Sequence, residues 1–583
     1  MLDARVKKIA FKLFSVISWV LISALIAVSF SGKKSAVKIS AETELENETS
    51  AHENQETYFY FFTEEQRKSI GEKIRSNEGA ALELTVFDDG EKNFFYRTVR
   101  FGFIYDSGER NGKGFPLSVN IRPYVSFNFS LMKSSEVKIS MCFSKSSGNV
   151  KGFYVFGEKS FHVENVDVVP AKIGWDISSD VPVLAFGCDG GRADSSFLSA
   201  DFSSAKKIFS EKNAPGTVMP KVEIKLRSVS DVPVENGMGR LGFKYGDENY
   251  IVRRSPSQSL FTIQTSAAKN GFSLMEFTEN ASLVESVFMT ANEENLCSDG
   301  EFVDEPFVSD VGMIILWPKS AWRTKDYELF RWEQFPDVLV FDFASYRIQN
   351  RFMTRLAYYV EKDGYRGKFV GDDFIETKKS YNAHDYKADD LADFFTQAEK
   401  KKIRLNKEEI LLRKILVKNG IIVDGGNGNY LPGKGAVISM SKESWTELRY
   451  QLMAHEAWHG IYFIDPDFRK FADSIYEKTS STAVGFLKSY FSSYESLDYD
   501  TKSGYLMRNE FMAYMLQQSP ENTGKNFMKI STWSTIAEKK PSQCAYMQKT
   551  RCSDFVTASN LLCGYVSERW GYWGGRNYLI SKN

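Results

Sequence analysis

Two of the five histidines in this 583-residue chain lie in one short run, His455-Glu456-Ala457-Trp458-His459. Positions four apart share one face of an α-helix, so both imidazoles can reach a single metal ion. Glu456 lies beside that face, where a carboxylate can hold a metal-bound water and accept its proton as a general base. The run therefore predicts a hydrolytic zinc site on a helix. Two core histidines bonded only to the backbone are the weaker alternative.

The surrounding sequence predicts a strand that leads into this helix. Residues 435–440 are mostly apolar and suit a short strand, and Ser444 with Glu447 has the Ser-x-x-Glu form of a capping box. From Leu448 onward, two leucines and then both histidines recur at spacings of four, three and four residues. Because these spacings keep the side chains on one helix face, we expect the histidines to face the domain interior.

A catalytic zinc site needs a third protein ligand and an open position for water. Asp465 follows the second histidine at the offset used when the chain turns sharply after the helix, but Tyr462 stands where that turn normally needs glycine. Glu510 is the better candidate, because it lies in an otherwise apolar helix predicted for residues 508–516. Burying a carboxylate there is costly unless a metal ion compensates it. We expect Zn²⁺, although the same ligands accept cobalt or nickel.

The downstream run Asn509-Glu510-x-x-Ala513 completes a known pattern. Together with the His-Glu-x-x-His run, it resembles the gluzincin branch of zinc metallopeptidases. The resemblance covers residues 435–515, and we recognise no family for the rest of the chain.

The resemblance implies a role for each matching residue. It makes Glu456 the catalytic base, and it makes strand 435–440 the sheet edge along which an extended peptide substrate lies. The zinc ligands that it implies are His455, His459 and Glu510. Such enzymes often use a Tyr or His to stabilise the tetrahedral oxyanion. The candidates for that role are Tyr514, Tyr499 and His384.

These features predict an exported zinc metallopeptidase that hydrolyses peptide bonds with a zinc-bound water activated by Glu456. A first alternative is a zinc amidase that acts on cell-wall peptides. A second alternative is a non-catalytic adhesion or assembly protein whose zinc is structural. The expected partner is a peptide or protein substrate, and a net charge of −1 gives no electrostatic reason to expect nucleic acid.

The chain is too long for one ordinary core, so we predict a multidomain protein. Residues 58–205 alternate apolar and polar positions between turn residues, which predicts an all-β, sandwich-like domain. Residues 206–311 continue as a second β-rich region, and neither part shows a catalytic constellation. We expect a scaffold or docking role for both. Residues 312–583 mix strands and helices and are predicted to form one α+β, zincin-like metallopeptidase domain.

Several elements of the predicted catalytic domain can be placed. Residues 338–343 suit a buried strand. Amphipathic helices are predicted for residues 349–361, 391–400 and 407–417. Residues 382–386 read as a polar loop, for which entry into a helix is favoured over a place in the cleft.

The N-terminus predicts export. Four basic residues precede the uncharged, mostly apolar stretch 13–30, so residues 1–31 are predicted to be a signal peptide or a membrane anchor. If the protein associates with a membrane, residues 13–30 are the segment expected to insert. Residues 32–57 are polar and acidic, which predicts a flexible linker. We therefore expect a periplasmic, cell-surface or secreted protein. The six cysteines lack Cys-x-x-Cys spacing and predict buried thiols with at most one disulfide rather than a metal cluster.

Overall fold

The fold is described from a computed structural model of the chain. The predicted signal or anchor segment 1–31 lies outside the described residues. Within the part that is described, no helix is both long and apolar enough to cross a membrane. The described residues are 37–39, 43–52, 55–88, 98–106, 119–120, 124–128, 134–146, 150–158, 161–193, 197–209, 218–231, 239–268, 271, 273–296, 302–377, 381–493, 497 and 499–582.

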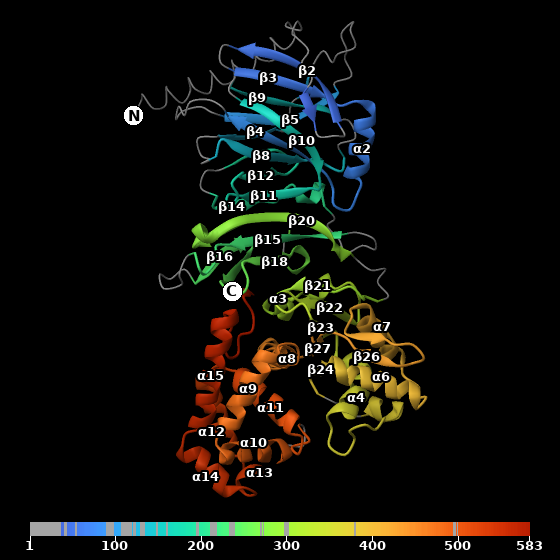
Figure 1. Cartoon of the computed structure of the whole chain (residues 1–583), viewed down its shortest axis with the longest axis vertical. Helices are drawn as coiled ribbons and strands as arrows, with labels where there is room; N and C mark the ends of the chain where they lie inside the picture. The colour runs from blue at the N-terminus through green and yellow to red at the C-terminus, as the bar shows by residue number, and fades with distance from the viewer. Residues whose placement is uncertain are drawn as a thin grey trace. The chain divides into compact units, whose positions relative to one another are not determined.

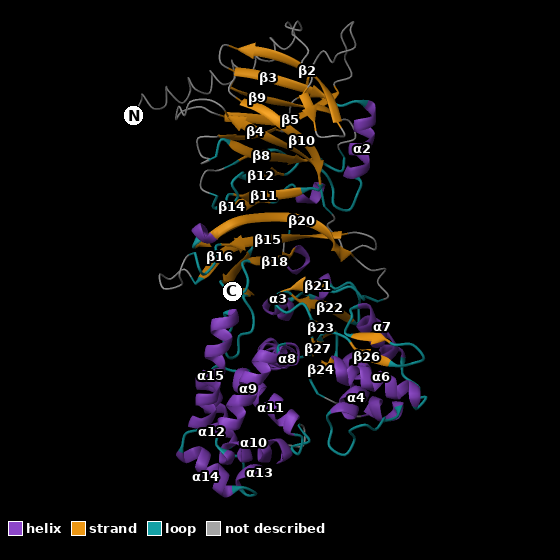
Figure 2. Cartoon of the chain, viewed as in Figure 1, coloured by secondary structure: helices purple, strands orange, loops and turns teal. Residues whose placement is uncertain are grey.

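Two compact units make up the chain. The first consists of Met1–Glu211, Phe272–Glu276 and Val284–Ala291. The second consists of Lys212–Gly271, Phe277–Leu283 and Asn292–Asn583. Strands dominate the chain up to β20 (Val284–Leu296) and helices dominate after it, as Figure 2 shows. The predicted order, β-rich first and helical later, is confirmed at this level.

The first unit is built from two sheets. One has the strand order β1-β2-β3-β9-β5-β7-β13, with β6 paired to β5, and the other includes the run β10-β4-β8-β12-β11-β20. The elements of this unit are β1 (Val37–Ile39), β2 (Thr43–His52), β3 (Gln55–Phe61), α2 (Glu64–Ile74), β4 (Ala81–Asp88), β5 (Thr98–Asp106), β6 (Val119–Asn120), β7 (Tyr124–Asn128), β8 (Glu136–Cys142), β9 (Val150–Glu158), β10 (Phe161–Val169), β11 (Lys172–Asp176), β12 (Val183–Phe186), β13 (Gly191–Arg192) and β14 (Ser199–Asp201).

Apolar side chains at every second position explain these strands. In β8, Val137, Ile139 and Met141 are all fully buried, as the alternating sequence predicts. The segment 32–57 differs from its prediction as a linker, because β2 lies inside it and pairs antiparallel with β3. Main-chain hydrogen bonds form that ladder, and they do not require apolar side chains.

The second unit contains further strands and most of the helices. Its elements, with two strands that lie at the boundary of the units, are β15 (Val218–Leu226), β16 (Arg240–Tyr245), β17 (Glu248–Arg253), β18 (Leu260–Gln264), β19 (Leu274–Glu279), β20, β21 (Phe307–Ser309), α3 (Val311–Leu316), β22 (Tyr327–Trp332), β23 (Val338–Phe343), α4 (Tyr346–Val360), α5 (Asp372–Thr377), β24 (His384–Lys387), α6 (Ala388–Lys400), α7 (Lys407–Lys418), β25 (Ile422–Asp424), β26 (Tyr430–Pro432), β27 (Ala436–Ser441), α8 (Thr446–Ile464), α9 (Pro466–Lys478), α10 (Ser481–Ser493), α11 (Gly504–Leu516), α12 (Pro520–Ile530), α13 (Ser534–Ala537), α14 (Pro541–Lys549), α15 (Ser553–Trp570) and β28 (Ile580–Lys582).

The central sheet of the second unit has the strand order β21-β22-β23-β27-β24. β23 and β27 are parallel, whereas β24 is antiparallel to β27 and forms the edge of the sheet. The expectation that strand 435–440 is the sheet edge is therefore wrong, because β27 has a partner on each side. The predicted loop at residues 382–386 also differs, since His384 begins an edge strand there.

Helix α8 follows β27 directly and packs against it (Figure 1). A Cβ atom on Gly460 would lie 3.3 Å from a methyl carbon of Val338, so the missing side chain lets helix and sheet approach closely. A buried ion pair links the same helix to β23, because Arg449 of α8 donates to both carboxylate oxygens of Asp342 at 2.9 Å. The predicted cap at Ser444 is wrong: Trp445 is the N-cap and makes no side-chain capping bond.

The C-terminal strand returns to the earlier β-rich part of this unit. β28 pairs antiparallel with β17, so Ile580 lies opposite Val252. The boundary expected at residue 312 is thus crossed by a main-chain ladder. The five cysteines in the described residues, Cys142, Cys188, Cys544, Cys552 and Cys563, are buried free thiols.

Candidate metal centre

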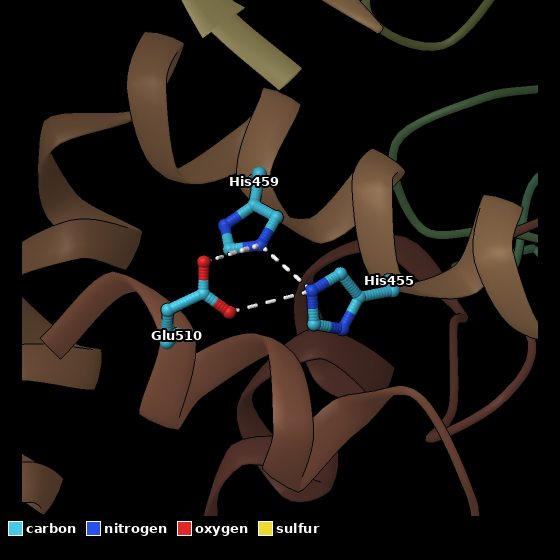
Figure 3. A group of neighbouring side chains, drawn as sticks. All are labelled: His455, His459 and Glu510. Carbon is cyan, nitrogen blue, oxygen red and sulfur yellow. Dashed lines mark hydrogen bonds and ion pairs between the residues drawn. The ribbon is translucent and has the colours of Figure 1, made fainter. Parts of the chain in front are cut away.

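Helix α8 carries both histidines of the central run at its buried face. His455 is 9% exposed and His459 is 1% exposed, and they lie one helical turn apart. Their Nε2 atoms are 3.1 Å from each other. Figure 3 shows the two rings converging on one point. The local structure thus has the geometry that the four-residue spacing predicts.

Glu510 reaches the same point from α11, a helix that packs against α8. Its Oε2 atom lies 3.5 Å from Nε2 of His455, and its Oε1 atom lies 3.8 Å from Nε2 of His459 (Figure 3). One potential ligand atom from each of the three residues lies within 4.8 Å of the others. The structure therefore brings together the three residues that the sequence singles out as metal ligands.

An outer contact sets the tautomer of His455. Its Nδ1 atom lies 3.1 Å from the amide oxygen of Gln517, the residue that caps the end of α11. Because an amide oxygen can only accept a hydrogen bond, Nδ1 carries the proton and donates it. The Nε2 atom then keeps its lone pair for a cation, which is how ligating histidines are normally oriented.

The carboxylate of Glu510 provides a test of whether a cation fits. Its Oε2 atom is buried and has no hydrogen-bond partner in the part of the chain that the structure describes. An anionic oxygen in that position is costly unless a positive charge faces it. Two imidazoles and one carboxylate form the donor set of a catalytic zinc site with an open position. The residues therefore fit a zinc ion.

Glu456 lies on α8 between the two histidines and lines a cavity of about 360 Å³ beside them. Its side chain is buried, and burial raises its pKa well above the usual value. The nearby carboxylates of Asp385, Glu510 and Glu361 raise that pKa further. A divalent cation beside these groups would favour their charged forms and so lower the same pKa.

Burial also shifts the pKa values of two neighbouring groups, Asp385 and His459. Burial raises the pKa of Asp385 to about 7, and burial lowers the pKa of His459 to about 4. The neutral form of His459 is the form that can bind a metal ion. Asp385 comes from the edge strand β24, and its Oδ2 atom lies 3.6 Å from Nε2 of His459.

All three candidates for the oxyanion-stabilising group line this cavity, namely Tyr514, Tyr499 and His384. The ring of Tyr514 meets the ring of His455 edge-on at 5.1 Å between centroids, and its hydroxyl is hydrogen-bonded to Tyr490. His384 is within hydrogen-bond distance of the Tyr386 hydroxyl through Nδ1, at 3.1 Å. The cavity thus presents phenol and imidazole groups on the same side of the fold as the metal ligands.

Asp465, the disfavoured candidate for the third ligand, does not belong to the cluster of His455, His459 and Glu510. Asp465 caps the start of α9, where its carboxylate accepts from the backbone amide of Phe468 at 2.8 Å. It therefore has a structural role, as the absence of the turn glycine suggests. Sequence reasoning missed Glu361, Asp385 and Gln517. The polar run at 382–386 is the only sequence signal for Asp385, and that run favours entry into a helix over a place in the cleft.

Weakening the outer contact of His455 should weaken metal binding without abolishing it. We expect Gln517→Leu to lower zinc affinity about 10- to 100-fold, because the imidazole loses the acceptor that orients it. Competition with a fluorescent zinc chelator measures this change. Gln517→Glu restores an acceptor and serves as the matched rescue. Equal zinc affinity in Gln517→Leu and the parent chain would show that this hydrogen bond does not support the site.

Comparison of the chain with models of protein families, with curated protein sequences and with solved structures finds no significant match. The geometry of His455, His459, Glu510 and the adjoining cavity is therefore the basis for a functional proposal.

Proposed function

We propose that this protein is a zinc metallopeptidase with a zincin-like catalytic domain. One observation carries the proposal: His455, His459 and Glu510 bring their ligand atoms within 4.8 Å of one another. Glu456 lies on the same helix and lines the adjoining cavity. A purely structural zinc site is normally closed by four protein ligands. Three ligands beside a cavity and a carboxylate suit catalysis better.

The sheet supports this proposal. β24 is an antiparallel edge strand, and two of its residues, His384 and Asp385, line the same cavity as the histidines. An edge strand offers unpaired main-chain groups to an extended peptide. A substrate that pairs with β24 would pass across the metal site. The segment that would align a substrate is therefore β24.

The chemistry can be assigned to residues of this chain. A bound zinc ion supplies a Lewis acid that lowers the pKa of water and polarises a carbonyl group. His455, His459 and Glu510 would hold that ion. Glu456 is placed to accept a proton from the attacking water and to pass it to the departing amine nitrogen. Tyr514, Tyr499 or His384 would donate to the developing oxyanion. Export through residues 1–31 stays part of the proposal.

Metal removal tests this function directly. We expect the purified chain to cleave a quenched fluorescent peptide, to lose that activity after treatment with a chelator and to regain it when about one zinc per chain is restored. A parallel assay on cell-wall peptides measures amidase activity. Faster turnover of wall peptides than of protein substrates would select the amidase. Zinc binding without turnover of either substrate would favour the adhesion or assembly protein.

A further inference from the structure

The cavity beside the candidate metal centre is lined by acidic side chains without basic ones among the described residues. Four carboxylates line it, together with the three histidines and several aromatic rings. The carboxylates belong to Glu361, Asp385, Glu456 and Glu510. Among the described residues that line this cavity, none is a lysine or an arginine. A ligand that enters the cavity therefore meets negative charge and no fixed positive charge.

One divalent cation does not balance this charge. A zinc ion held by Glu510 would favour the charged forms of the neighbouring carboxylates and would offset two of their charges. The ammonium of Lys362 donates to the carbonyl oxygen of Leu497 at 3.1 Å and lies over the ring of Tyr381, and its positive charge partly opposes the rise in the pKa of Glu361. Buried charges are costly unless a partner compensates them. The remaining carboxylates thus favour a positively charged ligand.

A second observation points to a ligand rather than to a structural cluster. Glu456 is 8% exposed and lines the cavity, and in the described part of the chain its carboxylate makes no hydrogen bond. The Oδ2 atom of Asp385 lies 3.6 Å from Nε2 of His459, and Asp385 also interacts electrostatically with His455. Carboxylates that support a fold are normally paired with arginine or backbone amides, as Asp342 is with Arg449. Among the described residues, the carboxylate of Glu456 has no partner of either kind, and it lines the cavity.

Aromatic rings make the cavity more suitable for a cation. Tyr381, Tyr490, Tyr499, Tyr514 and Trp533 line it beside the carboxylates. The faces of such rings attract ammonium and guanidinium groups, most strongly where water is excluded. The position of Lys362 over the Tyr381 ring, 3.8 Å from its centroid, shows one such contact at the border of the cavity.

We propose that Asp385 and Glu361 form a subsite for a cationic nitrogen group of the substrate, close to the scissile bond. The proposal rests on the metallopeptidase function and names its substrate class. Two sources supply this chemistry: the α-ammonium group of a peptide N-terminus, and the side chain of a lysine or arginine. Asp385 adjoins a ligand nitrogen of the metal site, so the cationic group lies within a few bonds of the reacting carbonyl.

The same charge pattern excludes one class of substrate. An enzyme that removes C-terminal residues must bind a free carboxylate beside the scissile bond, and this requires arginine, lysine or a comparable donor cluster. The described residues that line the cavity include no such cation. We therefore expect a C-terminal carboxylate near the scissile bond to slow cleavage.

Four peptide amides of otherwise equal sequence test the subsite. The first has uncharged side chains and a free, positively charged amino terminus, and the second is its neutral N-acetylated form. The third is the N-acetylated form with lysine before the scissile bond, and the fourth has glutamate there. We expect at least one cationic peptide to exceed the neutral acetylated one about 10- to 100-fold in kcat/KM, because a charge-assisted hydrogen bond forms. The free and lysine peptides distinguish the two sources of the cation. The glutamate peptide should be the poorest substrate.

Substitutions of the two subsite carboxylates test whether they cause the preference for cationic peptides. Asp385→Asn should bring the ratio of kcat/KM for the preferred cationic peptide to kcat/KM for the neutral acetylated peptide close to one, and this ratio is compared between variant and parent chain at equal zinc content. Glu361 lies on a different segment of the chain from Asp385. Glu361→Gln therefore provides a second test of the preference for cationic peptides if Asp385→Asn does not fold. Asp389→Asn is the matched control, since Asp389 is exposed at the start of α6 and does not line the cavity.

Different results of the peptide assay would contradict the cationic subsite and the metallopeptidase function. Equal cleavage of the neutral and cationic peptides, with activity still dependent on zinc, overturns the subsite alone. Absence of cleavage of all four peptides contradicts the metallopeptidase. In that case calorimetry with the same peptides and the zinc-loaded chain decides the subsite. Tighter binding of a cationic peptide, lost in Asp385→Asn, supports it, and equal binding overturns it.

Discussion

Replacing Glu456 with glutamine is expected to lower kcat for peptide hydrolysis about 10²- to 10⁴-fold and to leave zinc bound. Glutamine has nearly the same shape but cannot accept a proton, so the variant loses general base catalysis alone. Glu456 lines the cavity next to the histidines without being one of the three clustered ligands. Activity assays and metal analysis by mass spectrometry on the same sample measure both properties.

A matched control for this variant is available on the same helix. Glu447→Gln makes the same chemical change on the exposed first turn of α8, and it should retain full activity and full zinc content. Loss of zinc in Glu456→Gln would show that this carboxylate supports the metal rather than the water. Unchanged hydrolysis by Glu456→Gln would refute the proposed mechanism.

Removing the third ligand is expected to have the largest effect on metal binding. Glu510→Ala should lower zinc affinity by more than the roughly 10- to 100-fold loss that an outer contact causes. The carboxylate of Glu510 is the only acidic group of the three-residue cluster, and it comes from a different helix than the histidines. His455→Ala should lose both zinc and activity. Metal content after dialysis against a weak chelator measures these losses.

The control for this experiment is Glu521→Ala, which removes an exposed carboxylate from the first turn of α12 and should not change zinc content. One zinc per chain in the parent protein, lost in Glu510→Ala, would establish the three-ligand site. No zinc in the parent chain after reconstitution would leave the histidine run without a metal role and would favour a binding protein.

Local sequence patterns predict several helices and strands of the second unit well. The spacing of apolar residues locates β23, β27, α4, α6 and α7 to within a few residues, because that spacing follows the helix or strand period along the chain. Boundaries were less certain. Ser444 has the right spacing for a capping box, but its hydroxyl lies 2.6 Å from that of Tyr346 and is engaged there. A competing tertiary contact decided the start of α8.

The ligand set could be inferred from sequence for a physical reason. The two histidines lie on one turn of one helix, so their relative position depends only on helix geometry. Glu510 stood out because a carboxylate is unusual in an apolar helix, and such a group requires compensation. Glu361 gave no comparable signal, since a carboxylate at the end of a helix is common and normally solvated.

The sequence by itself determined what is local in this protein: the helix that carries His455, Glu456 and His459, the strand before it, and the anomaly of Glu510 in its apolar helix. Only the tertiary structure decided which strand forms the sheet edge and which carboxylates surround the metal ligands. Asp385 reaches His459 because β24 pairs with β27 beside α8. Strand order and cavity composition depend on long-range pairing, and neither hydrophobic period nor motif spacing encodes which distant segments meet.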